Sequence, residues 1–164
     1  MSPEPPSPGA WALGRAAVLA LCLSSFPAGA AADVLIHDGG VNRDRAAAET
    51  VRVATKMGVS VEPINGIPAQ AYLDAETGEG LEFVQSELDQ AAIGRGEGLP
   101  SMLQDIRKGR RTEIEYLNGY VVAQANKFNV NTPINHALAQ TVQKIEADKL
   151  TPAFSNLDIL ESYI

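Results

Sequence analysis

The chain has 164 residues, enough for one domain with a sizeable core or for a smaller domain with an appendage. Its formal net charge of -7 argues against nucleic-acid binding, which needs a basic surface, and against attraction to anionic membranes. Aromatic residues make up only 5% of the sequence while Ala is abundant, which favours close-packed helices over a sheet sandwich, and a single cysteine, Cys22, excludes an intrachain disulfide.

Residues 1–32 differ in composition from everything after them. A Pro- and Ser-rich start is followed by Arg15, the apolar run 16–23 and a small-residue stretch at 28–30, a pattern typical of a secretory signal peptide. The competing interpretation is a remnant of upstream coding sequence, because the start is long for a signal peptide and contains Glu4. Both interpretations leave residues 33–164 as the folded domain. We expect a cytoplasmic protein, or a secreted or periplasmic one if residues 1–30 act as a signal peptide.

The first predicted helix covers residues 43–57, with Asn42 as its N-cap and Gly58 at a left-handed C-cap. Its apolar stripe at 3.6-residue spacing is Ala46, Thr50, Val53 and Met57. Prolines and a glycine deny the following segment, 59–70, a long regular element. A second helix is predicted over 80–93, with a buried face made of Leu81, Val84, Leu88 and Ala92. The glycine-rich residues 94–98 then form a linker.

Three further helices are predicted in the rest of the chain. A short one begins at Pro100 or Ser101 and ends at Gly109, and the longest runs from Thr112 to about Phe128. The last is capped by Thr132, has Pro133 in its first turn and is ended by Pro152. The apolar stripe of the long helix is Ile114, Leu117, Val121, Ala125 and Phe128, and that of the last helix is Ile134, Leu138, Val142 and Ile145. With no strand alternation and no internal repeat, the prediction is an all-α helical bundle, against which the tail at 154–160 can pack.

A hydroxyl and a carboxylate stand on either side of the basic turn 108–111. If this turn folds two helices back on each other, Ser101 and Glu113 meet at one edge of the bundle. A Ser at a helix start can present its hydroxyl and nearby N–H groups to a carboxylate ligand, and a Glu can accept a hydrogen bond from a substrate hydroxyl. Spacing alone favours the structural alternative, in which Ser101 is an N-cap and Glu113 a favourable first-turn acid.

The blocks SMLQDIR, RRTEIEYLNG and NTPINHAL, in this order and spacing, resemble the C-terminal helical domain of the ketopantoate reductase (2-dehydropantoate 2-reductase) family. The resemblance implies a bundle of the 6-phosphogluconate dehydrogenase C-terminal-like type. It also implies that Ser101 and Glu113 contact a keto acid, with Asn118 of the Asn-Gly pair as a third substrate-binding residue. For Asn135 a structural capping role is the more plausible one. Neither His37 nor His136 has partners at metal-ligand spacing, so no metal site is expected.

The complete family enzyme uses NADPH and a catalytic Lys, and both belong to parts that this sequence lacks. Residues 94–98 follow a predicted helix rather than a strand and contain an acid, so they are a linker and not a phosphate loop. We therefore expect no cofactor site and no catalytic residue in this chain. It would be the substrate-binding half of a truncated or split reductase. Its partner would be a separate dinucleotide-binding domain or a second copy of the chain. The alternative is a non-catalytic helical binding module, possibly secreted.

Overall fold

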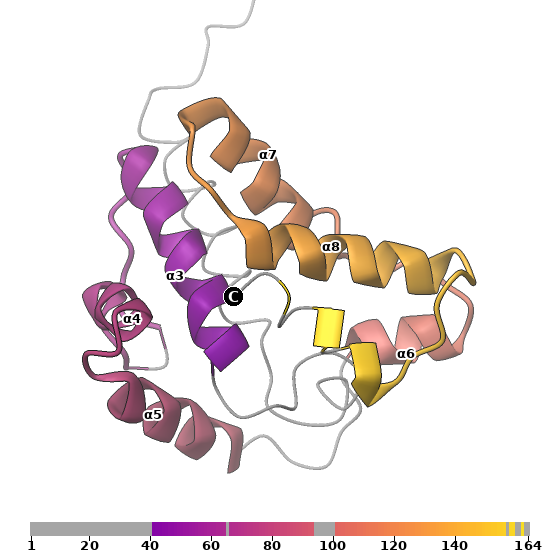
Figure 1. Cartoon of the computed structure of the whole chain (residues 1–164), viewed down its shortest axis with the longest axis horizontal. Coiled ribbons are helices and arrows are strands. Elements are labelled where there is room, and N and C mark those ends of the chain that lie inside the picture. The colour runs from indigo at the N-terminus through magenta and orange to yellow at the C-terminus, as the bar shows by residue number, and fades with distance from the viewer. Residues whose placement is uncertain (1–40, 65, 94–100, 157, 160–161, 163–164) are drawn as a thin grey trace, which may run out of the picture.

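The computed structural model describes residues 41–64, 66–93, 101–156, 158–159 and 162, and these are built from helices (Figure 1). In chain order the helices are α3 (Val41–Lys56), α4 (Ala69–Glu76), α5 (Leu81–Ile93), α6 (Ser101–Arg107), α7 (Asn118–Phe128) and α8 (Pro133–Glu146), followed by a short 3-10 turn at Phe154–Asn156. The described residues contain no strand beyond an isolated bridge between Ile64 and Ile67. The predicted all-α fold is confirmed. The predicted leader 1–32 and the linker 94–98 lie outside the described residues.

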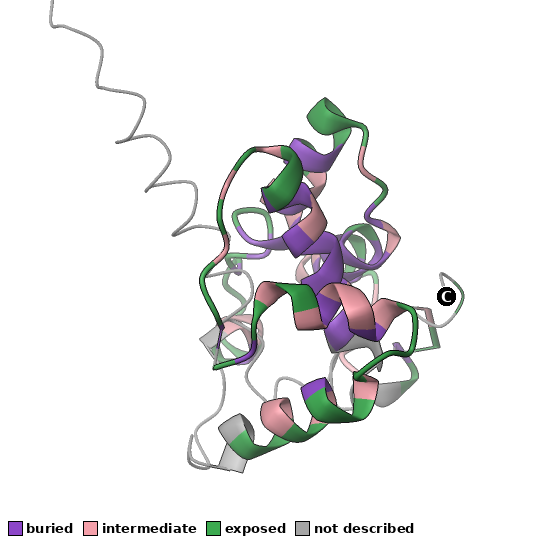
Figure 2. Cartoon of the chain, turned by 90° about the vertical axis from the view of Figure 1, so that its left-hand side faces the viewer, coloured by how far each residue is buried: buried purple, intermediate pink, exposed green. Residues whose placement is uncertain are grey.

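Helix α3 is the central element of the bundle. It contacts α4 and α5 on one side and α7 and α8 on the other, while α6 lies near the far end of α8 (Figure 1). Buried residues follow α3 and the helix faces turned toward it, and the outer faces are exposed (Figure 2). No helix in the described ranges is long and apolar enough to cross a membrane.

Small side chains allow α3 to be buried on more than one face. Ala47, Ala48 and Val51 pack with Tyr72 of α4 and Val84 of α5. Two further clusters lie on the other faces of α3. In one, Val53 and Ala54 pack against Leu117 and against Val121 and Ala125 of α7. In the other, Ala46 packs against Ile134, Ala137 and Leu138 of α8. A helix surrounded by others in this way has a wider apolar surface than a single stripe. The predicted stripe is confirmed for Ala46, Thr50 and Val53, whereas Met57 is only half-buried.

Helix α4 is the element that the sequence patterns do not predict. It follows Pro68, which stands just ahead of the helix in extended conformation, with φ -60° and ψ 143°. An eight-residue helix is marginal by itself in water, but the Tyr72 ring is buried against α3 with 2% exposure. Tertiary burial of one large side chain thus stabilises a segment whose local pattern is weak.

The predicted fourth helix begins too early. Residues 114–117 form turns after a bend at Glu113, and the Tyr116 and Leu117 amides both donate to the Glu113 carbonyl (2.9 and 3.1 Å). Ile114 and Leu117 have helical spacing, yet Ile114 packs against α8 whereas Leu117 packs against α3. Because their apolar partners lie in different directions, the segment cannot continue as one helical stripe. Asn118 and Gly119 therefore stand at the start of α7, not inside a longer helix.

Smaller differences concern helix ends. Asn42 lies inside α3 rather than ahead of it, and α8 ends at Glu146, well before Pro152. Phe128, predicted on the apolar stripe, is 40% exposed. Gly58 does adopt the left-handed conformation predicted after its helix, with φ of 73°, and Gly109, predicted to end the short helix, is also left-handed, with φ of 65°. The side chains of Ala92, Phe154, Leu157 and Leu160, for which packing was predicted, lie outside the described residues.

Candidate substrate-binding wall

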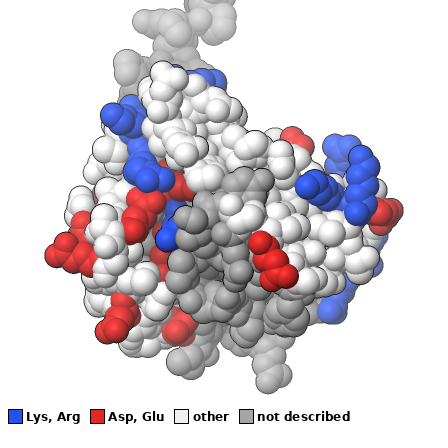
Figure 3. Space-filling model, in the orientation of Figure 1, with Lys and Arg blue, Asp and Glu red and all other residues white. Residues whose placement is uncertain are grey.

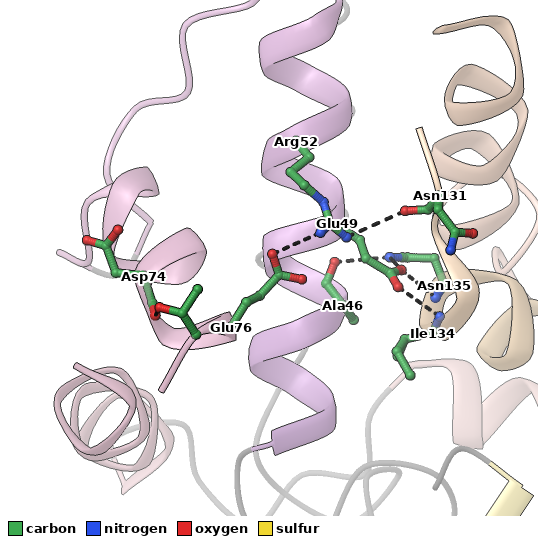
Figure 4. Close-up of polar contacts among 9 residues, drawn as sticks. Ala46, Glu49, Arg52, Asp74, Glu76, Asn131, Ile134 and Asn135 are labelled. Carbon is green, nitrogen blue, oxygen red and sulfur yellow. Dashed lines mark hydrogen bonds and ion pairs between the residues drawn. The ribbon is translucent and has the colours of Figure 1, made fainter. Parts of the chain in front are cut away.

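A buried carboxylate joins α3 to α8 next to the predicted site residues. Glu49 of α3 is 2% exposed, and its side chain points at the N-terminus of α8 (Figure 4). Its Oε1 accepts a hydrogen bond from the Ile134 amide (2.9 Å), and its Oε2 accepts from the amide (2.9 Å) and the Nδ2 (2.7 Å) of Asn135. Thr132, the predicted cap, stands at the N-cap position but makes no side-chain cap bond. The free N–H groups of α8 are instead satisfied by an acid from another helix, which the helix dipole also favours.

Asn135 extends this network to α7. Besides its bond to Glu49, its Nδ2 donates to the Ala46 carbonyl (3.0 Å), and its Oδ1 accepts from Asn118 Nδ2 (2.9 Å). Asn135 is fully buried, and Asn118 is 6% exposed. Each of these polar groups therefore has a partner, as buried amides require. A structural role for Asn135 agrees with the prediction, although its partners are on α3 and α7.

Burial raises the pKa of the Glu49 carboxyl, and the hydrogen bonds from Ile134 and Asn135 oppose this shift only in part. A raised folded-state pKa means that the folded chain keeps the proton to higher pH than the unfolded chain does. The contribution of Glu49 to stability is therefore full below its ordinary pKa of 4.5 and declines as pH rises through the folded-state value.

We expect the difference in unfolding free energy between the parent and Glu49→Gln to narrow as pH rises through this window. Urea unfolding followed by circular dichroism, repeated at several pH values on both proteins, measures the difference. If the difference in unfolding free energy widens as pH rises, hydrogen bonding to the ionised Glu49 carboxylate must outweigh the cost of its desolvation.

The structure places the predicted substrate-binding residues on α6 and on the segment that leads into α7. Ser101 is the first residue of α6, but its side chain is among those not described, so its predicted meeting with Glu113 stays a prediction. Glu113 is exposed at the bend that precedes the turns at 114–117, rather than in a first helical turn. Asn118 follows at the start of α7, with its Nδ2 engaged by Asn135. The residues 112–118, here called the wall segment, thus carry two of the three.

Two hollows among the described residues lie away from the wall segment. One, of about 310 Å³, is lined by Arg52, Thr55, Lys56, Leu73, Asn129, Val130 and Asn131. Beside it the Arg52 guanidinium pairs with Glu76 (3.0 Å) and donates to the Asn131 carbonyl (3.5 Å), which ties α3 to α4 and to the loop before α8 (Figure 4). The other, of about 210 Å³, lies between the start of α3 and the end of α4. Neither is lined by Glu113 or Asn118.

Charge is unevenly distributed over the face that carries these helices. Basic side chains gather over α6 and the end of α8, and acidic ones over α4 and α5 (Figure 3). The end of α6 and the turn after it expose Arg107, Lys108, Arg110 and Arg111, a few residues before Glu113. An anionic ligand at the wall segment would thus approach next to cations, despite the negative total charge. In the described part of the chain, no three potential metal ligands come together.

Sequence reasoning missed Glu49, the acid on which the network depends. The signal for it was present, because Ala46, Glu49, Thr50 and Val53 follow the spacing of one helical face. An acid inside such a stripe is either exposed at the edge of the buried face or paired in the interior. The sequence does not show which, because the donors that pair with it come from the first turn of α8, 85 and 86 residues further on.

A family model and two curated relatives are similar in sequence to this chain, and their names denote the same enzyme family. The family model described as "Ketopantoate reductase PanE/ApbA C terminal" matches residues 28–146. The 2-dehydropantoate 2-reductase of Archaeoglobus fulgidus is 36% identical over 69 residues, which are 42% of this chain and 24% of that protein. The enzyme of the same name from Vibrio cholerae is 31% identical over 83 residues, 51% of this chain and 28% of that protein. The chain thus matches about a quarter of the length of these relatives.

A solved structure gives the same indication for the fold. The PanE/ApbA family ketopantoate reductase from Ralstonia eutropha JMP134 superposes with a TM-score of 0.54 and 19% sequence identity. The superposition covers 82% of this chain and 41% of that chain. At this identity the likeness concerns the fold, and it agrees with the helical arrangement described above.

Proposed function

The chain belongs to the ketopantoate reductase PanE/ApbA C-terminal family, and on that premise we propose that it is the keto-acid-binding domain of an NADPH-dependent 2-dehydropantoate 2-reductase-like oxidoreductase. The observation that carries the proposal is the position of the motif residues. The TEIEYLNG block forms the wall segment and the first turn of α7, where Glu113 is exposed on a backbone tied to α8. The SMLQDIR block forms α6 immediately before it.

In this proposal the chain holds and orients the substrate. Glu113 accepts a hydrogen bond from a hydroxyl of the keto acid, and Ser101 donates to its carboxylate. Asn118 contributes its side-chain oxygen while its Nδ2 is held by Asn135. Orientation of this kind lowers the barrier of a reaction whose reacting atoms are supplied elsewhere.

NADPH supplies the hydride in the complete family enzyme. The described residues of this chain do not fit a dinucleotide, since they contain no unit of strand, glycine-rich turn and helix. We therefore assign to the chain no step that involves the cofactor. A separate dinucleotide-binding domain, or the corresponding part of a longer protein, completes the site, with or without a second copy of this chain. We place the activity in the cytoplasm, and a secreted or periplasmic location would follow if residues 1–30 act as a signal peptide.

Titration of the isotope-labelled chain with 2-dehydropantoate tests this assignment. We expect saturable shifts of backbone amide signals in residues 101–103 and 113–118, because the ligand contacts are concentrated there. The matched control ligand is 3-methylbutanoate, a branched carboxylate without the keto and hydroxyl groups, which should shift these signals much less. Equal responses to both ligands, or none to either, would contradict specific recognition of the keto acid.

A non-catalytic binding module is the second candidate function. The groove at the C-terminal half of α3 favours it, because Arg52 and Lys56 stand beside the apolar side chains of Leu73 and Val130. Such a mixture suits an organic anion with an aliphatic part. The same titration separates the two functions, since binding in this groove would shift the signals of residues 52–56 and 129–131 and leave the wall segment unchanged.

A further inference from the structure

The wall segment is laid along α8 and held by it at three places. At one end the Thr112 amide donates to Glu146 Oε1 (2.5 Å), at the C-terminus of α8. In the middle, Gln143 Nε2 donates to Glu115 Oε1 (3.0 Å). At the other end Asn118 Nδ2 donates to Asn135 Oδ1 (2.9 Å), at the N-terminus of α8.

These contacts attach the two ends of the segment to opposite ends of α8. Asn135 and Glu146 are separated by about 16 Å along α8, at about 1.5 Å rise per residue. Between its ends the segment turns, since the Tyr116 and Leu117 amides both donate to the Glu113 carbonyl (2.9 and 3.1 Å). The Ile114 side chain fixes its middle, because it is buried against Ala139, Val142 and Ile145 of α8.

The contact with Glu146 differs from the other two in its chemistry. It joins a half-buried carboxylate to a backbone N–H, so it fixes the main chain itself one residue before Glu113. Hydrogen bonds to an ionised acceptor are shorter and stronger than neutral ones. Beyond Thr112 toward the N-terminus lies the exposed turn 108–111, and before that turn Met102 and Ile106 of α6 pack against the cluster that contains Ile114.

We propose that Glu146 is a positioning residue, which holds the backbone of the wall segment so that the Glu113 carboxylate is presented to the keto acid in one orientation. This inference rests on the proposed function for its consequence, but the holding of the segment can be measured without any ligand. Glu146 itself does not touch the substrate.

The variants Glu146→Ala and Glu146→Gln of the full chain test the proposal, with Lys144→Ala as matched control, since Lys144 is exposed on the same turn of α8. The first readout is hydrogen exchange of the Ile114, Tyr116 and Leu117 amides, whose acceptors lie within the wall segment and not on Glu146. We expect faster exchange at these three in Glu146→Ala, no change in the α3 helix, and recovery in Glu146→Gln, which keeps an oxygen acceptor.

The second readout is the dissociation constant for 2-dehydropantoate. We expect it to rise about ten- to a hundredfold in Glu146→Ala, the scale of loss that follows from a misplaced orienting group, and to recover largely in Glu146→Gln. Unchanged exchange in Glu146→Ala, or faster exchange with unchanged affinity, would overturn the positioning role. If the parent chain binds no keto acid, the proposed function fails, and the exchange measurement still decides whether Glu146 holds the segment.

Discussion

Replacing Glu113 with Ala should lower kcat/KM for keto-acid reduction by roughly ten- to a thousandfold. The measurement is made on a chimera, in which residues 33–164 are joined to a family dinucleotide-binding domain that carries the catalytic Lys. The loss is large because the carboxylate is expected to make a charge-assisted hydrogen bond that orients the substrate near the nicotinamide. The measurement is steady-state reduction of 2-dehydropantoate, followed by NADPH absorbance. The fold should survive, since exposed surface substitutions usually change stability by less than about 0.5 kcal/mol.

Glu115→Gln provides the matched control for this experiment. Glu115 is also exposed in the wall segment, and its Oε1 accepts a hydrogen bond from Gln143 of α8. The substitution removes a negative charge but keeps an oxygen that can accept from Gln143. We expect Glu115→Gln to keep most of the activity and Ser101→Ala to lose part of it. A chimera in which Glu113→Ala and Ser101→Ala are both fully active would refute the substrate-binding assignment.

Replacing Glu49 with Ala should destabilise the fold by about 3 to 5 kcal/mol, because three buried N–H groups of Ile134 and Asn135 lose their acceptor at once. Relief of the desolvation that raises the Glu49 pKa offsets part of this loss. A change of this size is a large fraction of the total stability of an ordinary domain, which is about 5 to 15 kcal/mol. Thermal and urea unfolding of the purified variant, followed by circular dichroism at 222 nm, give the measurement.

The conservative and control variants sharpen this test. Glu49→Gln should fall between the parent and Glu49→Ala, because its amide oxygen can accept from α8 while its NH2 group faces further donors. Glu79→Ala removes an exposed acid and should change stability little. If the unfolding free energy of Glu49→Ala lies within about 0.5 kcal/mol of the parent value, water must reach the N-terminus of α8, and the capping role of Glu49 would be wrong.

Local sequence patterns were enough to predict the helical class and the position of the family motif. The periodic stripes of α3 and α8 and the left-handed glycines after α3 and α6 are local signals, and each depends on residues within a few positions of one another. The SMLQDIR and TEIEYLNG blocks are also local, and they are the patterns from which Ser101, Glu113 and Asn118 were predicted as substrate-binding residues. Local patterns of this kind survive in the fold because helices satisfy their own backbone hydrogen bonds.

Where the helices begin and end depends on contacts between residues that are far apart in the sequence. Helix α4 forms because Tyr72 is buried against α3, and the predicted long helix breaks because Ile114 and Leu117 pack into different clusters. The cap of α8 comes from Glu49, which accepts a hydrogen bond from the Ile134 amide, 85 positions further along the chain. A sequence pattern records that a side chain is apolar or acidic, but the partner that decides between burial and exposure is set by which helices meet.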